Sequence, residues 1–226
     1  MAERILIINP NSSLSCTDGI AAAVAGFSAP GLPRIEVTRL ADGPPAIVTW
    51  RDWFSVAEKL ARVIETQEAC AYIIGCVSDP GLELARTVTQ RPVFGMLRSA
   101  VTAALNRADR FGMIGFTDLS RPRQEKCFQA LGVEQRLAGW IPLNLGMEEL
   151  TDPVAPRARI CATARALAAG GAQVIVLGCA GMAGHRAAAE DAAGVPVIEP
   201  AQAAAAAAIA AVLAAREMAG LRLAAE

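Results

Sequence analysis

The feature that most constrains this chain is a repeated pattern of an apolar run ending in glycine and cysteine, followed by a run that begins with proline and valine. The pattern occurs at Gly75-Cys76 with Pro92-Val93, and again at Gly178-Cys179 with Pro196-Val197. The cysteine-to-proline spacings are 92 − 76 = 16 and 196 − 179 = 17 residues. In the first half, the first predicted strand ends at Ile8, which is 76 − 8 = 68 residues before Cys76. In the second half, the first predicted strand ends at Phe116, which is 179 − 116 = 63 residues before Cys179. Two agreeing spacings predict an internal duplication, so the 226 residues should form two similar halves.

Short β-branched runs alternate with alanine-rich segments of helical length, which is typical of βα units on parallel sheets. The predicted strands are Arg4–Ile8, Ile35–Leu40, Ala71–Gly75, Pro92–Gly95, Phe111–Phe116, Arg136–Leu143, Gln173–Gly178 and Val195–Ile198. The predicted helices are Ser15–Ala25, Arg51–Gln67, Pro80–Thr89, Arg98–Ala108, Ser120–Leu131, Val154–Ala169, Met182–Ala192 and Ala201–Met218. The fold class is therefore α/β, with four parallel strands in each half.

Cys76 and Cys179 each follow a predicted strand directly. Ligands of open parallel sheets bind beyond the carboxyl ends of the strands. If the halves pack face to face about a pseudo-twofold axis, both thiols point into one cleft from opposite sides. Inverting a carbon stereocentre by proton transfer needs a base on one face and an acid on the other, and a thiol can serve as either.

The loops after the two cysteines lead into predicted helices. Helix N-termini would lower the pKa of the thiols and offer amides to a substrate carboxylate, imide or enolate oxygen. The sequence contains no GxGxxG or P-loop motif, no CxxC pair and a single histidine, His185. We therefore predict a racemase that needs no metal and no other cofactor.

Composition and charge limit the classes of partner and the cell compartment that we expect for this chain. Net charge is −1, basic and acidic residues are mixed, and aromatic residues are 4% of the chain, so we expect no nucleic-acid partner. The longest apolar run, Ala203–Ala215, has 13 residues, fewer than the roughly 18 of a membrane span. Met1–Pro10 does not resemble a signal peptide. We expect a cytoplasmic protein with free thiols and a small-molecule substrate.

Three motifs, taken together, resemble the Asp/Glu/hydantoin racemase superfamily, and most closely its hydantoin and allantoin racemase branch. They are Asn9-Pro10-Asn11-Ser12-Ser13, Cys76-x-x-Asp79-Pro80-Gly81-Leu82 and Leu177-Gly178-Cys179-Ala180-Gly181-Met182. The resemblance implies two Rossmann-like parallel-sheet halves related by pseudo-twofold symmetry, an interdomain active site, no cofactor and a homo-oligomer. It places the catalytic pair at Cys76 and Cys179, and substrate-binding loops at Asn9, Asn11, Ser78, Thr117, Ser120, Ala180 and Gly181.

One segment departs from the pattern of the hydantoin branch. Members of that branch usually carry Gly-Pro-x-x-Ile-Glu after the second strand, whereas here Val48 stands in place of the acid. This wall of the pocket is therefore expected to be more apolar. A hydantoin with an apolar or aromatic 5-substituent fits that wall, and so does a different carbon acid.

Several of these residues also have ordinary structural interpretations. Asn9 and Asn11 can form a turn, Thr117 and Ser120 can be helix caps, and Asp79 can cap the helix that Pro80 begins. A further group is interpreted as structural: Cys16, Cys70, Cys127, Cys161, Glu199 and a surface-exposed His185, with Trp50 assigned equally to core, subunit contact or pocket wall.

The predicted domains are residues 1–97 with 201–226, and residues 98–200, with hinges near 95–98 and 199–201. Two other enzyme types on the same scaffold remain open. One resembles arylmalonate decarboxylase, which keeps only the second cysteine, and the other resembles maleate isomerase, which keeps both. A two-lobed small-molecule binding protein is a third alternative.

Overall fold

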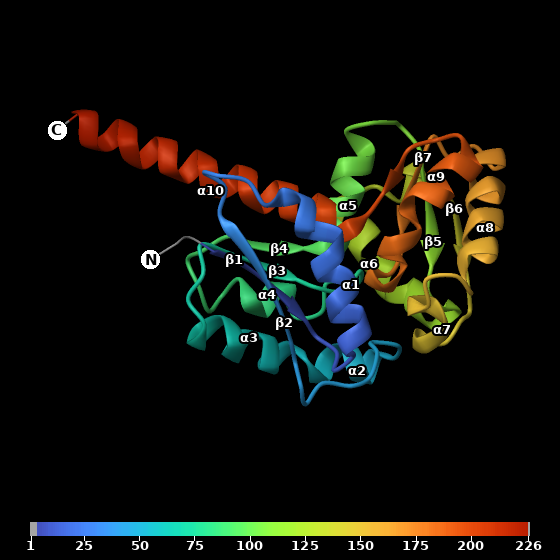
Figure 1. Ribbon diagram of the computed structural model, residues 1–226, viewed down its shortest axis with the longest axis horizontal. Coiled ribbons are helices and arrows are strands. Elements are labelled where there is room, and N and C mark those ends of the chain that lie inside the picture. The colour runs from blue at the N-terminus through green and yellow to red at the C-terminus, as the bar shows by residue number, and fades with distance from the viewer. Residues whose placement is uncertain (1–3, 226) are drawn as a thin grey trace.

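The structure is a computed structural model that describes residues 4–225, with side chains as far as Met218. Its elements form two matching series (Figure 1). The first contains β1 (Arg4–Asn9), α1 (Leu14–Val24), η1 (Ala25–Phe27), β2 (Arg34–Arg39), α2 (Trp50–Ser55), α3 (Ala57–Thr66), β3 (Ala71–Ile74), α4 (Leu82–Ala85), β4 (Val93–Gly95) and α5 (Met96–Leu105). The second contains β5 (Phe111–Gly115), η2 (Asp118–Ser120), α6 (Arg121–Leu131), η3 (Glu134–Arg136), β6 (Leu137–Pro142), α7 (Met147–Thr151), α8 (Arg157–Ala169), β7 (Val174–Leu177), η4 (Ala180–His185), α9 (Arg186–Ala193), β8 (Val197–Ile198) and α10 (Pro200–Ala225).

Each series forms one four-stranded parallel sheet. The strand orders are β2-β1-β3-β4 and β6-β5-β7-β8, so the two sheets have the same topology. The α/β fold with two parallel-sheet halves predicted from the repeat is confirmed, and all eight predicted strands are present to within two residues at each end.

Alternate residues of the central strands face different cores, as the period of a β-strand requires. Ile5 and Ile7 of β1, with Met113 of β5 and Val176 of β7, belong to one core that both sheets share with α1, α5, α6 and α10. The intervening residues face two outer cores, one under α2–α4 and the other under α7–α9. A shared core fixes the two halves against each other, and with them the strand ends that carry the cysteines.

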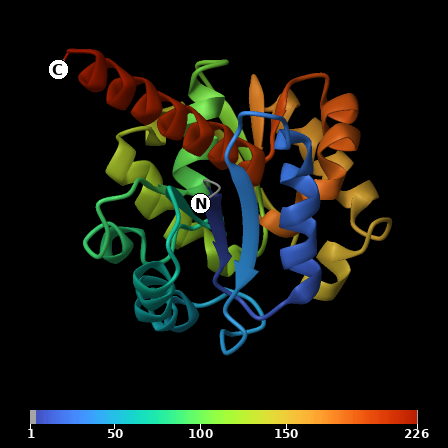
Figure 2. The same cartoon turned by 60° about the vertical axis from the view of Figure 1, so that its left-hand side comes forward.

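The last helix of each series packs on the sheet of the other series. Helix α5 contacts β5, β7 and β8 besides its own β4, whereas α10 contacts β3, β4 and α1. Helices α5 and α10 also pack against each other, and Figure 2 shows α10 crossing in front of α5. The chain therefore crosses between the sheets after β4 and again after β8.

Helix α10 is the one described helix that is long and apolar enough, by length and composition, to cross a membrane. Its apolar residues are explained by packing, because the side chains of its first half lie in the shared core. The buried ones are Ala201, Ala204, Ala205, Ala208, Ile209 and Val212. The first half of α10 is therefore a core helix.

Three predicted helices differ from the structure. The helix expected over Arg51–Gln67 is interrupted at Val56, and the one over Pro80–Thr89 shrinks to α4. The second difference has a backbone cause, because Asp79 and Gly81 adopt positive φ angles of 49° and 68° and turn the chain. The segment after Cys179 begins as the 3₁₀ helix η4, and α7 was not predicted.

Candidate active site

Cys76 and Cys179 occupy equivalent positions, one residue beyond β3 and β7. The Gly75 amide donates to the Ile8 carbonyl at 2.8 Å, and the Gly178 amide donates to the Ile114 carbonyl at 2.7 Å. A Cβ atom at Gly75 would lie 2.9 Å from the Ile8 carbonyl oxygen, and one at Gly178 would lie 2.3 Å from that of Ile114. Glycine is required at both positions because the backbone passes this close to the neighbouring strand.

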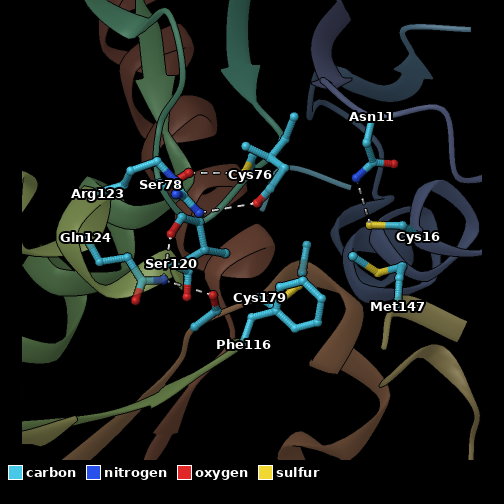
Figure 3. A pocket seen from close by; sticks show the side chains of 15 residues that line it. Asn11, Cys16, Cys76, Ser78, Phe116, Ser120, Arg123, Gln124, Met147 and Cys179 are labelled. Atoms are coloured by element: carbon cyan, nitrogen blue, oxygen red, sulfur yellow. Dashed lines mark hydrogen bonds between the residues drawn. The ribbon is translucent and has the colours of Figure 1, made fainter. Parts of the chain in front are cut away.

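The two cysteines line one pocket, which has an empty volume of about 420 Å³ including the space at its open mouth. In the close view of Figure 3, Cys76 enters from the end of β3 and Cys179 from the end of β7, with Phe116, Asn11 and Met147 around them. The complete lining is Asn11, Cys16, Ile47, Gly75, Cys76, Val77, Ser78, Phe116, Ser120, Arg123, Gln124, Met147, Gly178, Cys179 and Ala180.

The structure brings most of the predicted site residues to this pocket and places the others behind it. The lining includes Asn11, Ser78, Ser120 and Ala180 besides the two cysteines. The lining does not include Asn9, Thr117 or Gly181. The buried Asn9 amide instead donates to Asn11 Oδ1 and Thr17 Oγ1, both at 3.0 Å, so that it shapes the loop that carries Asn11.

Cys76 lies among polar groups. Its sulfur is 3.4 Å from the Ser78 hydroxyl, and the Ser78 carbonyl accepts a hydrogen bond from Trp53 Nε1 at 2.9 Å. Burial raises the pKa of the Cys76 thiol to about 11, while the Ser78 hydrogen bond and the charge of Arg123 act in the opposite direction. Desolvation therefore outweighs any lowering by a helix terminus, contrary to the prediction from sequence.

Cys179 packs against the outer core of the second sheet, as Cys76 packs against that of the first, but it has no hydrogen bond to a described side chain. Burial raises the pKa of its thiol strongly, the nearby Cys16 and Cys76 thiols raise it further, and a hydrogen bond from the Gly181 backbone lowers it. No cation appears among the causes of this shift. The Cys179 thiol is therefore harder to ionise than the Cys76 thiol.

Gln124 of α6 joins the loops that carry the two cysteines. Its Nε2 donates to the Val77 carbonyl at 2.9 Å and to the Gly178 carbonyl at 3.0 Å, and its Oε1 accepts from Trp140 Nε1 at 2.7 Å. The Gln124 side chain is 1% exposed, and all three partners are fixed by the fold. One amide therefore sets the distance between the main chain after Cys76 and the main chain before Cys179.

The sequence analysis did not identify Gln124, Arg123 or Met147, and it assigned the pocket residue Cys16 to structure alone. Cys16 is in α1, and its sulfur is 3.9 Å from the Asn11 amide nitrogen. One sequence feature could have predicted that Cys16 lines the pocket, namely its position about one helical turn after the loop that carries Asn11. Arg123 and Gln124 gave no signal, because they reach the pocket from α6 through tertiary packing.

Two structural interpretations are wrong in detail. Asp79 caps α5 rather than the helix after Pro80, with its carboxylate accepting from the Leu97 and Arg98 amides at 2.8 and 3.0 Å. His185 is buried rather than at the surface, and its Nε2 lies 3.1 Å from the Asp152 carbonyl oxygen. Glu199 caps α10 through the Ala201 and Gln202 amides, which agrees with a structural role.

Among the side chains of residues 4–218, no group of three or more His, Cys, Asp or Glu could hold a metal ion. What the pocket offers chemically is three thiols, those of Cys16, Cys76 and Cys179, with one buried cation, hydroxyls and main-chain amides. These groups can remove a proton from carbon, stabilise an oxyanion and return a proton.

Residues 5–208 match the family model described as Asp/Glu/Hydantoin racemase. The chain is 33% identical over 207 residues to a hydantoin racemase of Paenarthrobacter aurescens, which covers 89% of this chain and 87% of that protein. It is also similar to the allantoin racemase structure from Klebsiella pneumoniae, with a TM-score of 0.84, 30% identity and coverage of 94% and 89%. An arylmalonate decarboxylase structure, with a TM-score of 0.62, 21% identity and coverage of 92% of each chain, shares the fold. The chain belongs to the Asp/Glu/hydantoin racemase family and is an isomerase of the racemase type.

Proposed function

We propose that this racemase needs no cofactor and interconverts the enantiomers of a 5-substituted hydantoin or a related amino-acid derivative by proton transfer between Cys76 and Cys179. The observation that carries the proposal is the placement of two thiols at equivalent strand ends in one pocket. The hydantoin and allantoin racemases among its relatives support this substrate class.

In the proposed reaction, one cysteine thiolate takes the proton from the stereogenic carbon. The electron pair of the broken C–H bond moves into the adjacent carbonyl and forms an enolate. The other thiol then delivers its proton to the opposite face of the carbon. Because each thiol serves one face, the reverse direction uses the same two groups with their roles exchanged.

The apolar side of the pocket supports an apolar substituent on the substrate. Ile47, Phe116 and Met147 line the pocket, and Val48 packs with the outer core of the second sheet. Val48, which replaces the acid usual in the hydantoin branch, follows the lining residue Ile47 and is itself not part of the lining. We expect aliphatic or aromatic 5-substituents to bind better than charged ones.

The test is a panel of 5-substituted hydantoins, allantoin, aspartate and glutamate, incubated in D₂O and followed by NMR. Exchange of the α-proton reports carbanion formation whatever the product. Exchange accompanied by loss of optical rotation for one or more hydantoins supports the proposal. Exchange confined to aspartate or glutamate, or loss of activity with EDTA that a divalent ion restores, contradicts it.

A decarboxylase of arylmalonate type is a second candidate, because a structure of that enzyme shares the fold. Decarboxylation needs one proton donor, so a second thiol at Cys76 favours racemisation. A single-enantiomer product with release of CO₂ from an arylmalonate would identify the decarboxylase. Isomerisation of maleate to fumarate would identify the third enzyme type.

A two-lobed binding protein is the non-catalytic candidate. It would protect the pocket thiols from alkylation when a ligand binds but would leave the ligand unchanged. We further propose that the protein works in the cytoplasm as a homo-oligomer on a small molecule, without a nucleic-acid or membrane partner. Size-exclusion chromatography with light scattering tests the oligomeric state.

A further inference from the structure

Arg123 is a buried cation in the wall of the pocket. Its side chain extends from α6, and the residue is 2% exposed. Figure 3 shows it reaching past Ser78 toward Cys76. A guanidinium keeps its charge in nearly every protein environment, so this position places a full positive charge beside the Cys76 side of the pocket.

The described residues do not neutralise this charge. Arg123 is absent from the ion pairs between described residues. One amino group donates to the Leu119 carbonyl at 2.9 Å and the other to the Ile47 carbonyl at a long 3.5 Å, while the buried Nε has no described partner. Cys76 and Asp52 act on the guanidinium electrostatically, and its Cζ lies 5.9 Å from the centroid of the Trp50 ring. Asp52 itself accepts hydrogen bonds from the Val48 and Thr49 amides.

A buried charge without a counter-charge destabilises a protein, and a buried N–H without an acceptor does the same. Such a group is expected where a ligand supplies what the protein lacks. The other ionisable groups in the lining are the thiols of Cys16, Cys76 and Cys179, and burial raises the pKa of each, so Arg123 has no counter-charge in the pocket while these thiols keep their protons.

We infer that the Arg123 guanidinium binds the substrate oxygen that gains negative charge when the proton leaves carbon, namely the carbonyl oxygen next to the stereogenic centre. The inference rests on the proposed function and names a ligand group for it. When the C–H bond breaks, the proton goes to a cysteine sulfur and the electron pair goes to this oxygen. A fixed guanidinium in a water-poor pocket stabilises that oxyanion more than it stabilises the neutral carbonyl.

The first test compares Arg123→Met, Arg123→Lys and the wild type with a hydantoin that the wild type racemises. We expect Arg123→Met to lower kcat by about 10²–10³-fold, the usual effect of losing one oxyanion donor, with a smaller change in KM. Arg123→Lys should recover at least tenfold of that loss because it keeps the charge. Arg62→Met is the matched control, since Arg62 forms an exposed pair with Glu58 on α3, and it should be within twofold of the wild type.

A second readout does not depend on turnover. The probe is 5,5-dimethylhydantoin, which has no α-proton and becomes an anion as the pH rises through the ionisation of its imide. Calorimetric titration should show that the wild type binds the anion more tightly than the neutral form. In Arg123→Met this preference should disappear.

The outcomes separate the two ideas. A wild type that exchanges no hydantoin α-proton refutes the proposed function. A wild type that racemises hydantoins while Arg123→Met keeps its kcat within threefold, or keeps its preference for the anion, refutes the role of Arg123. If Arg123→Met melts well below the wild type, Arg123→Lys decides: a folded Arg123→Lys that recovers none of the lost kcat and shows no preference for the anion also refutes it.

Discussion

The two halves of the molecule have the same sheet topology and place a cysteine at the same strand end, yet they surround that cysteine differently. Cys76 has the Ser78 hydroxyl at 3.4 Å and the Arg123 cation nearby. Cys179 has the Gly181 backbone as its hydrogen-bond partner and no cation nearby, while an outer apolar core lies behind each of the two thiols. The loop after Cys76 turns sharply through Asp79, whereas the chain after Cys179 continues directly into η4.

The difference shows that the repeated backbone and the surrounding side chains have separate roles, one in positioning the thiols and the other in setting their pKa values. The backbone positions one thiol on each side of the pocket, and the surroundings decide which thiol loses its proton first. The pKa of Cys76 is raised to about 11 by burial, and that of Cys179 is raised further by burial and by neighbouring thiols. We therefore expect that in the free enzyme Cys76 is the thiol that ionises first and can act as base, while Cys179 keeps its proton and can act as acid.

The strongest test of this comparison removes one thiol at a time. Cys76→Ser and Cys179→Ser should each abolish racemisation, because the third thiol of the lining, Cys16, lies in α1 and does not occupy either of the two equivalent strand ends. Loss of a positioned acid or base lowers rates by about 10²–10⁴-fold. Each variant should still exchange the α-proton of one enantiomer in D₂O, and the two variants should select opposite enantiomers, as NMR on the separate enantiomers would reveal.

Cys161→Ser is the matched control for this experiment. The Cys161 sulfur donates to the Ala188 carbonyl at 3.3 Å and lies outside the pocket lining. Its activity should equal that of the wild type. If both pocket variants exchange the same enantiomer, the two thiols do not serve opposite faces, and near wild-type racemisation by either variant excludes that cysteine from the reaction.

The second test loosens the link between the halves. Gln124→Leu removes the donor that holds the Val77 and Gly178 carbonyls and the acceptor of Trp140 Nε1, which leaves two buried acceptors and one buried donor without this partner. Each such loss costs about 1–3 kcal/mol, so chemical denaturation should show a lower free energy of unfolding. Racemisation should fall about tenfold or more, while exchange on one face falls less, because only inversion depends on the spacing of both thiols.

The control for Gln124→Leu is Gln129→Leu, which changes an exposed glutamine on the same helix. It should alter neither stability nor rate measurably. Equal losses of exchange and inversion in Gln124→Leu would mean that Gln124 supports the fold without setting the thiol spacing.

The third test reads the order of ionisation directly. Iodoacetamide reacts with thiolates, and below its pKa the thiolate fraction of a cysteine grows about tenfold per pH unit. Peptide mass spectrometry of the wild type at increasing pH should show Cys76 labelled before Cys179, with the Cys76 reaction levelling off near pH 11. Labelling of Cys179 first would reverse the assigned roles of base and acid.

The sequence predicts what the backbone repeat determines and misses what tertiary packing determines. Cys76 and Cys179 were found because each ends an apolar run after glycine, and all eight strands followed from the same alternation. Arg123 and Gln124 were missed because a polar residue on a helix surface has the same local pattern whether it faces solvent or a pocket. The buried site of His185 was missed for the same reason.

The lengths of elements after the cysteines were also hard to predict. The positive φ of Asp79 shortens the helix after Cys76 to four residues, and this conformation is uncommon for a residue other than glycine. The Asp79 carboxylate is needed 18 residues further along, at the start of α5, where it accepts from the Leu97 amide. A cap between residues so far apart in the chain cannot be predicted from the local sequence.

The smallest expected effect is on the free energy of unfolding, and it comes from the residues that cap α5 and α10, the two helices that each pack on the sheet of the other series. Asp79 caps α5, and Glu199 caps α10. Burial raises the pKa of Asp79 from 3.8 to about 7, and it raises that of Glu199 as well. A carboxyl with a raised pKa in the folded state binds its proton more tightly when folded than when unfolded. Its contribution to stability is therefore complete below about pH 4 and is lost as the pH rises through about 7.

Asp79→Asn should remove this pH dependence without breaking the turn, because asparagine tolerates a positive φ and keeps one oxygen for the cap. Between pH 5 and 7 the wild type should lose at most about 2 kcal/mol of unfolding free energy relative to Asp79→Asn, since one proton is worth about 1.4 kcal/mol per pH unit. Denaturant titrations at several pH values measure the difference, and Glu199→Gln should behave with the same sign. If the difference in stability between the wild type and Asp79→Asn instead stays constant from pH 5 to 7, the Asp79 carboxylate is ionised throughout this range, and the first half holds α5 by a charged cap rather than by a neutral one.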